Sequence, residues 1–301
     1  AGTELCIYKG SHSGLQSEKK WPRYPYYPGY SAVGRVLQKG QAVGDRIHTG
    51  DYAFYMGNHA SQHIKDVNQL YKIPEGVKPE EGTFGKLGAI SLQGVRRSDI
   101  RLGDSAVIQG QGIIGLLATR FAALAGAYPI IAIDRLPHRL ELAMELGATH
   151  AINCDENDVT GKVRNLTDGK GADIVIEASG HAPSIQTACT FARDGGSVVL
   201  LGSPHGVASM NFYTDVHARY LRIIGAHENG SRDISTDSHS WSMPDCVRRV
   251  LALIAHGDLQ PGAIINHRVS PDDLPDVYQR LAEGTLTSLG IMVDWKGYNH
   301  G

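Results

Sequence analysis

The architecture of this chain follows from one short glycine-containing run, Gly110-Gln111-Gly112-Ile113-Ile114-Gly115. This run has the spacing G-x-G-x-x-G, follows an apolar strand expected at residues 105–108 and opens an apolar helix expected at 113–125. A strand, a glycine turn and a helix in this order form the phosphate-binding turn of dinucleotide-binding folds. The first glycine permits the tight turn, the second lets the backbone approach a pyrophosphate, and the third lets the helix pack on the strand. The pyrophosphate charge would then rest on the helix N-terminus.

An acidic residue follows at the spacing that such a turn requires. A second strand is expected at residues 129–133, and Asp134 comes directly after it, 24 residues after Gly110. A carboxylate at this position accepts hydrogen bonds from an adenosine ribose diol and repels a 2′-phosphate, which favours NAD over NADP. Arg135 and Arg139 act against this preference, because a nearby guanidinium can pair with a phosphate. We therefore expect NAD as the cofactor.

Strands and helices continue to alternate after this unit. Further helices are expected at residues 137–146 and 181–192, and further strands at 172–176, 197–201 and 221–224. Such alternation predicts an α/β fold, a doubly wound parallel sheet covered by helices on both faces.

Two turns should complete the cofactor site, because ligands of open α/β sheets bind beyond the carboxyl ends of the strands. One turn follows the strand ending at residue 176 and the other follows the strand ending at 201. His205 and His227 follow strands near the same edge; each is a candidate for substrate contact, and the alternative is a surface or hydrogen-bonded histidine. The residues expected to bind the cofactor are Gly110, Gly112, Ile113, Ile114, Gly115, Asp134, Arg135, Arg139, Ala178, Ser179, Gly180, Gly202, Ser203 and Pro204.

The composition excludes several classes of protein. The chain has 301 residues, of which 29 are Lys or Arg and 31 are Asp or Glu, with a net charge of -2 and 42% apolar residues. We expect a soluble protein of two domains. Nucleic acid is not an expected partner, because no basic surplus exists to bind phosphate backbones. The most apolar window, residues 113–133, contains Arg120 and Pro129 and is interpreted as a buried helix and strand instead of a membrane span.

The cysteines and the first residues of the chain predict a cytoplasmic location. The four cysteines are far apart and form no C-x-x-C pair, which argues against a zinc finger or a disulfide scaffold. The first 14 residues have neither the basic head nor the apolar segment of a secretory signal.

The regions before and after this α/β segment do not show the alternation of strands and helices. Short β-type runs at residues 33–37 and 52–55 predict small antiparallel strands. Between residues 19 and 28 lies an aromatic and basic stretch whose three prolines exclude a helix or a central strand. This stretch is a solvated loop or a loop that borders a substrate cleft. Near the other end, residues 245–256 predict an amphipathic helix.

Together these motifs resemble the medium-chain dehydrogenase/reductase superfamily, in particular its sorbitol and alcohol dehydrogenase-like members, over nearly the whole chain. Gly2-Thr3-Glu4 is similar to the G-(S/T)-(D/E) that follows the first active-site cysteine of the family. Pro28-Gly29-Tyr30-Ser31-Ala32-Val33-Gly34 resembles P-G-H-E-x-x-G, and Val43-Gly44-Asp45-Arg46-Ile47 resembles V-G-D-R-V. Leu102-Gly103-Asp104 stands where the family has P-G-D before the cofactor fold.

The resemblance implies a division into two domains and an oligomer. A GroES-like, β-rich catalytic domain, incomplete at its N-terminus, would comprise residues 1–86 and 227–301, and the NAD-binding Rossmann domain would comprise residues 87–226. A homodimer or homotetramer would form through the cofactor domains, with residues 197–203 and 207–212 near the interface.

The chain departs from the family at the metal sites. A catalytic zinc needs three N, S or O ligands, and the positions that supply them in the family hold Ala1, Tyr30 and Gly85, while the glutamate after the histidine is replaced by Ser31. The four-cysteine loop of the structural zinc is also missing. Residues 57–63 resemble a family strand, in which the two histidines would share no helical face. We therefore expect no metal.

Without a metal, another group must handle the proton or charge of the substrate oxygen. Thr3 stands at the proton-relay hydroxyl position of the family, Tyr30 replaces the histidine, and Glu4 would be the partner of the group that replaces the metal. The alternatives are aromatic filling of a vacated pocket for Tyr30 and structural hydrogen bonding for Thr3 and Glu4.

The function expected from these residues is hydride transfer on a small-molecule alcohol or carbonyl compound. The leading hypothesis is a zinc-independent, NAD-linked oxidoreductase of a secondary alcohol, polyol or cyclic ketone. Two alternatives stay open: a zinc-free quinone or enone reductase that uses NAD(P)H, and an NAD-binding protein without turnover.

Overall fold

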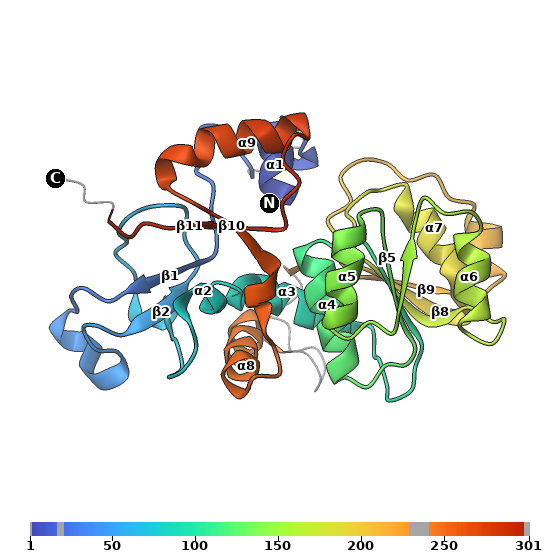
Figure 1. Ribbon diagram of the computed structural model, residues 1–301, viewed down its shortest axis with the longest axis horizontal. Coiled ribbons are helices and arrows are strands. Elements are labelled where there is room, and N and C mark those ends of the chain that lie inside the picture. The colour runs from blue at the N-terminus through green and yellow to red at the C-terminus, as the bar shows by residue number, and fades with distance from the viewer. Residues whose placement is uncertain (1, 17–20, 229–240, 298–301) are drawn as a thin grey trace. The chain divides into compact units, whose positions relative to one another are not determined.

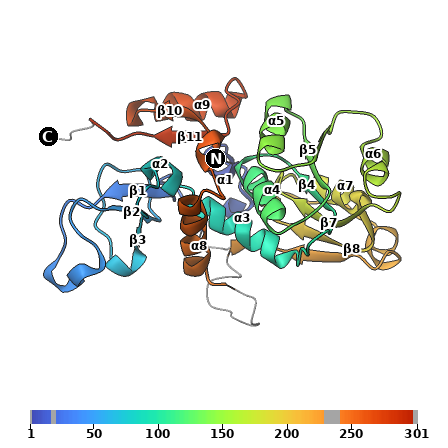
Figure 2. The ribbon, with the colours of Figure 1, turned by 60° about the horizontal axis from the view of Figure 1, so that its bottom comes forward.

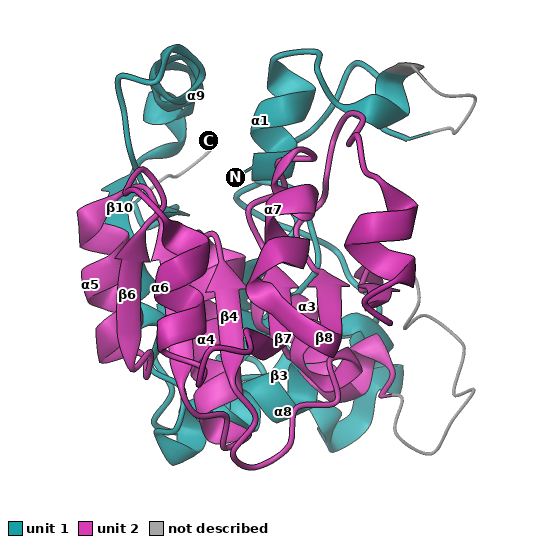
Figure 3. Ribbon diagram, turned by 90° about the vertical axis from the view of Figure 1, so that its right-hand side faces the viewer, with its two compact units in different colours: residues 1–87, 247–301 teal, residues 88–246 magenta. Residues whose placement is uncertain are grey.

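The computed structural model describes residues 2–16, 21–228 and 241–297. They belong to two compact units, one formed by Ala1–Leu87 with Val247–Gly301 and the other by Gly88–Cys246 (Figure 3). No helix among the described residues has the length and apolar character needed to cross a membrane. We call these unit 1 and unit 2 and describe each by itself; the functional domain limits at residues 86 and 226 stay a prediction.

Unit 2 contains a six-stranded sheet in which every neighbouring pair is parallel. The strand order is β6-β5-β4-β7-β8-β9, so the winding direction reverses between β4 and β7. All four residues of β4 are buried, as expected for a strand covered on both faces. The strands (Figures 1, 2 and 3) are β4 Ala106–Gln109, β5 Ile130–Asp134, β6 His150–Asn153, β7 Ala172–Glu177, β8 Ala192–Leu200 and β9 Arg222–Gly225.

Helices pack on this sheet through small and branched apolar side chains. Val107, Val175 and Val198 from three strands join Phe191 of the helix α7 in one buried cluster. Helix α5 begins with Pro137 in its first turn, where the missing N–H costs no hydrogen bond. The helices associated with this sheet are α3 Gly85–Arg97, which begins in unit 1, α4 Ile113–Leu124, α5 Pro137–Glu145, α6 Val159–Asn165 and α7 Ser184–Phe191.

The doubly wound α/β fold predicted from the glycine turn is confirmed, with local differences. The helix expected at residues 181–192 begins only at Ser184, after Pro183, which occupies the N-cap position. Strand β8 begins at Ala192, five residues earlier than expected, and its pairing with β7 shifts register near that end. The short elements β6 and α6 had no clear sequence signal, because few of their residues are buried.

Unit 1 contains two small sheets. The antiparallel sheet joins β1 Ala32–Arg35, β2 Tyr52–Tyr55 and β3 Tyr71–Lys72, which lie side by side in Figure 2. The parallel pair joins β10 Ile265–Val269 and β11 Gly290–Val293. The α-helices associated with this unit are α1 Gly2–Tyr8, α2 Pro79–Gly82, α8 Met243–His256, which begins in unit 2, and α9 Leu274–Glu283.

One strand expectation in unit 1 is wrong. Residues 57–63, which resemble a family strand, lie outside any strand or helix, because β2 ends at Tyr55. The side chain of His63 instead contacts the carbonyl of Asn58, with 3.0 Å between Nε2 and the oxygen, and its ring packs edge-on against Tyr55. His59 lies in the same segment, between Asn58 and His63.

Candidate functional site

The glycine turn of unit 2 has the geometry that its spacing predicts. Gly110 has φ 92°, and a Cβ there would lie 2.7 Å from the backbone of Ser179. A Cβ on Gly115 would lie 1.8 Å from the carbonyl oxygen of Gly110, so helix α4 packs on the turn at a distance that only glycine permits. Gly112 has no neighbour within 4 Å of a Cβ. It therefore leaves open space at the start of α4, where the first N–H groups of a helix lack intrahelical partners.

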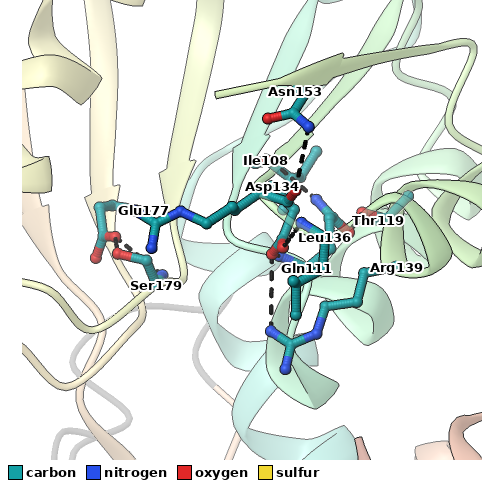
Figure 4. A network of polar contacts seen from close by, with 10 residues as sticks. Ile108, Gln111, Thr119, Asp134, Leu136, Arg139, Asn153, Glu177 and Ser179 are labelled. Carbon is teal, nitrogen blue, oxygen red and sulfur yellow. Dashed lines mark hydrogen bonds and ion pairs between the residues drawn. The ribbon is translucent and has the colours of Figure 1, made fainter. Parts of the chain in front are cut away.

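Asp134 is built into this turn (Figure 4). Its Oδ2 accepts a hydrogen bond from the N–H of Gln111 at 2.6 Å, and its Oδ1 accepts one from the N–H of Leu136 at 2.9 Å. Its side chain is 9% exposed, and Nη1 of Arg139 lies 3.8 Å from Oδ2. Arg135, in contrast, points to Asp155, with 3.4 Å between Nε and the carboxylate.

The turns after β7 and β8 lie against each other and against the glycine turn. The N–H of Ala178 donates to the carbonyl of Gln109 at 2.8 Å. A Cβ on Gly202 would lie 2.5 Å from the nitrogen of Gly180, and one on Gly180 would lie 3.1 Å from the carbonyl oxygen of Ser203. The structure thus brings the three predicted cofactor segments together at the carboxyl ends of neighbouring strands, where ligands of such sheets bind. Pro204 follows Ser203 in the third segment.

Glu177 was not among the predicted site residues, yet it organises the second turn. Its Oε1 accepts hydrogen bonds from the N–H of Ser179, at 2.9 Å, and from the Ser179 hydroxyl (Figure 4). Its side chain is fully buried, and Oε2 has no hydrogen-bond partner among the described residues. Burial therefore raises the pKa of the Glu177 carboxyl, although the bonds to Ser179 oppose this effect.

In unit 1, the predicted residue Glu4 holds the loop that carries Tyr30. Its Oε1 accepts a hydrogen bond from the N–H of Gly29 at 2.6 Å. Gly29 has φ 94°, and a Cβ there would lie 2.5 Å from the nitrogen of His59. The N–H of His59 in turn donates to the carbonyl of Pro28 at 2.8 Å. The loop at Gly29 and the loop at His59 are thereby held together beside Glu4. Thr3, the neighbour of Glu4 on α1, is half-buried.

Phenols and an imidazole surround the Glu4 carboxylate. Tyr278 of α9 hydrogen-bonds Glu4, and burial together with the Glu4 charge and the neighbouring Tyr26 and Tyr30 raises its pKa far above the ordinary value. Burial and the same carboxylate raise the pKa of Tyr26. Burial lowers the pKa of His59, while the negative charge of Glu4 partly compensates. We call Glu4, Tyr26, Tyr30, His59 and Tyr278 the Glu4 cluster.

Three members of this cluster, Tyr26, His59 and Tyr278, were not predicted as reaction candidates, although Tyr26 lies in the aromatic stretch that was considered as a possible border of a substrate cleft. His59 was considered only for metal binding, and Tyr278 lies in α9, which carries no motif. Tyr278 reaches Glu4 because α1 packs against α9, and the rings of Tyr8 and Tyr278 lie 5.5 Å apart. No local pattern could have predicted that contact.

Comparisons with known proteins find similar chains among the dehydrogenases. Residues 114–242 match the family model described as zinc-binding dehydrogenase. The chain is 26% identical to D-guloside 3-dehydrogenase of Escherichia coli (strain K12), over 85% of this chain and 73% of that protein. It is 29% identical to L-threonine 3-dehydrogenase of Pyrococcus abyssi, over 97% of this chain and 88% of that protein.

Solved structures of similar proteins cover almost the whole chain. An alcohol dehydrogenase from Thermus sp. ATN1 superimposes with a TM-score of 0.77 at 26% identity, covering 98% of this chain and 89% of that chain. The NADP-bound structure of a protein from Sinorhizobium meliloti 1021 that is named as a zinc-binding dehydrogenase gives a TM-score of 0.78 at 25% identity, covering 97% of this chain and 87% of that chain.

The donor set around Glu4 does not fit a catalytic zinc. Such a zinc takes three protein ligands, usually His, Cys, Asp or Glu. Within the described residues no group of three such side chains is arranged to hold a metal ion. The Glu4 cluster offers one carboxylate and one imidazole, and its other members are phenols, which rarely bind zinc. The groups that are present can instead donate, accept and hold protons.

Proposed function

The chain belongs to the medium-chain dehydrogenase/reductase superfamily as an alcohol dehydrogenase-like oxidoreductase, and on this premise we propose a zinc-independent, NAD-linked reaction. The substrate we propose is a secondary alcohol, a polyol or a cyclic ketone. The proposal depends mainly on one observation: a carboxylate, an imidazole and three phenols gather in unit 1, where related enzymes are expected to place metal ligands.

Unit 2 contains the residues that would hold the dinucleotide. Gly112 leaves open space at the N-terminus of α4 for a pyrophosphate, and each oxygen of Asp134 keeps lone pairs for a ribose hydroxyl after accepting one backbone N–H. When bound, the cofactor supplies a nicotinamide that accepts or donates hydride. The Asp134 charge supports NAD. Two observations favour NADP: Arg139 lies beside Asp134, and one relative is bound to NADP. The ratio of the Kd values for NAD and NADP is therefore the first quantity to measure.

The Glu4 cluster provides the proton chemistry in this proposal. Glu4 fixes the loop at Gly29 and thereby the position of Tyr30, whose phenol donates a proton to a carbonyl oxygen or receives one from an alcohol. The raised pKa keeps Tyr278 protonated, so it acts as a hydrogen-bond donor. The lowered pKa keeps His59 neutral near pH 7, so it can accept the released proton. Thr3 supplies a further hydroxyl beside Glu4.

The names of the relatives support a secondary hydroxyl as the reacting group. D-Guloside 3-dehydrogenase and L-threonine 3-dehydrogenase are both named for position 3, which is an internal carbon in both substrates. An internal carbon that bears a hydroxyl is a secondary alcohol. A panel of secondary alcohols, polyols and cyclic ketones is therefore the appropriate first screen, with enones included to detect the alternative reductase reaction.

Replacing Tyr30 with Phe tests this proposal. NAD and NADP are titrated by calorimetry, metal content is measured, and turnover is assayed with the preferred cofactor. We expect Tyr30→Phe to lower kcat by about 10²- to 10⁴-fold, the usual contribution of a general acid or base, with an unchanged Kd for the cofactor. Tyr220→Phe, at an 83% exposed tyrosine of unit 2, is the matched control. Unchanged turnover in Tyr30→Phe would remove the phenol from the reaction, and activity that depends on bound zinc would refute zinc independence.

A further inference from the structure

A chain of aromatic rings extends from the Glu4 cluster in two directions. On one side the ring of Tyr26 lies 6.3 Å from that of Trp21, and the two rings are nearly perpendicular. On the other side the ring of Tyr278 lies 5.5 Å from that of Tyr8. The inner rings are half-buried, whereas Trp21 is 55% exposed and Tyr8 is 53% exposed. The carboxylate and the phenols are thus flanked by two open aromatic surfaces.

The loop that carries Trp21 is held in place by contacts within unit 1. The rings of Trp21 and His12 are perpendicular, with 5.2 Å between their centroids. The hydroxyl of Tyr24 donates to the carbonyl of Ile7 in α1, and Gly29 is bound by Glu4. Rings that are already fixed before a ligand arrives lose little conformational freedom on binding. The arrangement therefore has the properties of a preformed contact surface.

Rings of this kind beside a carboxylate match the surface of a carbohydrate ring. A pyranose has flat patches of C–H bonds on its faces and hydroxyl groups around its rim. An aromatic ring packs against the C–H patches, and carboxylates, phenols and imidazoles form hydrogen bonds with the hydroxyl groups. An open-chain polyol has the hydroxyls without a fixed apolar face, and a simple cyclic ketone has the face without the hydroxyls. A pyranose uses both features of the site.

We infer that the substrate which binds at the Glu4 cluster is a pyranose ring, either a free sugar or a glycoside. Trp21 and Tyr8 contact its C–H surfaces, and Glu4, Tyr26 and Tyr278 contact its hydroxyls. Trp21 and Tyr8 are positioning residues in this assignment, because they touch the body of the ring and take no part in proton transfer. The assignment of a reaction to this ring rests on the proposed function, whereas its binding does not.

Binding is measured without turnover by saturation-transfer NMR on the full chain, with and without NAD. The probes are methyl pyranosides of the gluco, galacto and manno series and the alditols of the same configurations. We expect saturation of the ring C–H protons of at least one pyranoside and a weaker signal from its alditol. Equal or tighter binding of the alditols, or binding of no pyranoside, would overturn the inference.

Substitution of the exposed rings locates the binding surface. Trp21→Ala and Tyr8→Ala should each weaken the Kd of the pyranoside about 3- to 10-fold, the usual effect of one aromatic contact, and Trp21→Phe should restore most of the loss. Tyr128→Ala, at a 66% exposed tyrosine of unit 2, is the control and should change nothing. If folded Trp21→Ala and Tyr8→Ala both bind as the unchanged protein does, the rings are not the site. Pyranoside binding without any NAD-linked turnover would refute the proposed function alone.

Discussion

Two glycines of the same turn, Gly112 and Gly115, should respond to alanine in opposite ways. A methyl group on Gly112 meets nothing within 4 Å, and the backbone there, at φ -74° and ψ -174°, is accessible to alanine. A methyl group on Gly115 would lie 1.8 Å from the Gly110 carbonyl oxygen and 2.9 Å from its carbon. The first substitution therefore changes the space available to a ligand, and the second changes the packing of α4 on the turn.

The magnitudes follow from these contacts. Gly115→Ala forces backbone against backbone, so we expect the upper range of overpacking, about 3 kcal/mol or more. In a unit of this size that lowers Tm by about 6–12 °C, at roughly 2–4 °C per kcal/mol. Gly112→Ala loses only the mild preference for glycine over alanine at an N-cap, at most about 1 kcal/mol. Its Kd for NAD should rise at least about tenfold, which corresponds to about 1.4 kcal/mol, because the methyl group stands where the pyrophosphate approaches.

Thermal unfolding by circular dichroism and NAD titration by calorimetry separate the two effects. The expected pattern is an almost unchanged Tm with weakened NAD binding for Gly112→Ala, and a clearly lowered Tm for Gly115→Ala. If Gly112→Ala binds NAD as tightly as the unchanged protein, the pyrophosphate does not lie at this helix N-terminus. If Gly115→Ala keeps its Tm, the packing of α4 on the turn does not require glycine at position 115.

Four further outcomes are expected. Glu4→Gln removes the negative charge that helps to raise the pKa of Tyr278, so the alkaline limb of the pH–rate profile should move to lower pH. If the limb does not move, it reports the titration of another group. Asp134→Ser removes the like charge that opposes a 2′-phosphate, so calorimetry should show the ratio of the NADP Kd to the NAD Kd falling at least about tenfold, or about 1.4 kcal/mol. Burial raises the pKa of Glu177 in the folded protein, so the folded state binds more protons than the unfolded state between the two pKa values. The folded state therefore loses stability as the pH rises from the unfolded pKa to the folded pKa. Glu177→Gln removes this loss, so thermal unfolding should show a larger rise in Tm at pH 7 than at pH 4. Phe212 is 68% exposed in the segment expected near the subunit interface of a homodimer or homotetramer. Phe212→Asp should therefore abolish that association, so that sedimentation reports a monomer at a concentration at which the unchanged protein sediments as a dimer or tetramer; an unchanged protein that sediments as a monomer would contradict the expectation.

Local rules were sufficient to predict the glycine turn and every strand of the parallel sheet except β6. The turn geometry depends on residues within a few positions of Gly110, and the contact of Gly115 with the Gly110 carbonyl is a direct consequence of the spacing between them. The position of Asp134 at the carboxyl end of β5 follows from the lengths of one helix and one strand. Sequence periodicity records such short-range relations well.

Long-range packing explains what the sequence did not reveal. Tyr278 joins Glu4 only because α9 lies on α1, and no pattern near either residue indicates this. Helix α6 has the sequence VTGKVRN, in which only Val163 is buried, and it begins at the cap Asp158, whose side chain accepts the N–H of Gly161. Its start thus depends on one capping hydrogen bond, with little apolar periodicity to support it.

The division of the chain between the two units sets an order of assembly during synthesis. Unit 2 is one continuous segment, Gly88–Cys246, whereas unit 1 needs both Ala1–Leu87 and Val247–Gly301. Chains emerge from the ribosome N-terminus first, and continuous domains fold as they appear. A nascent chain that has not yet reached α9 is therefore expected to hold a complete dinucleotide fold while Glu4 still lacks Tyr278. The nascent chain would therefore be able to bind a dinucleotide cofactor before it could act on a substrate.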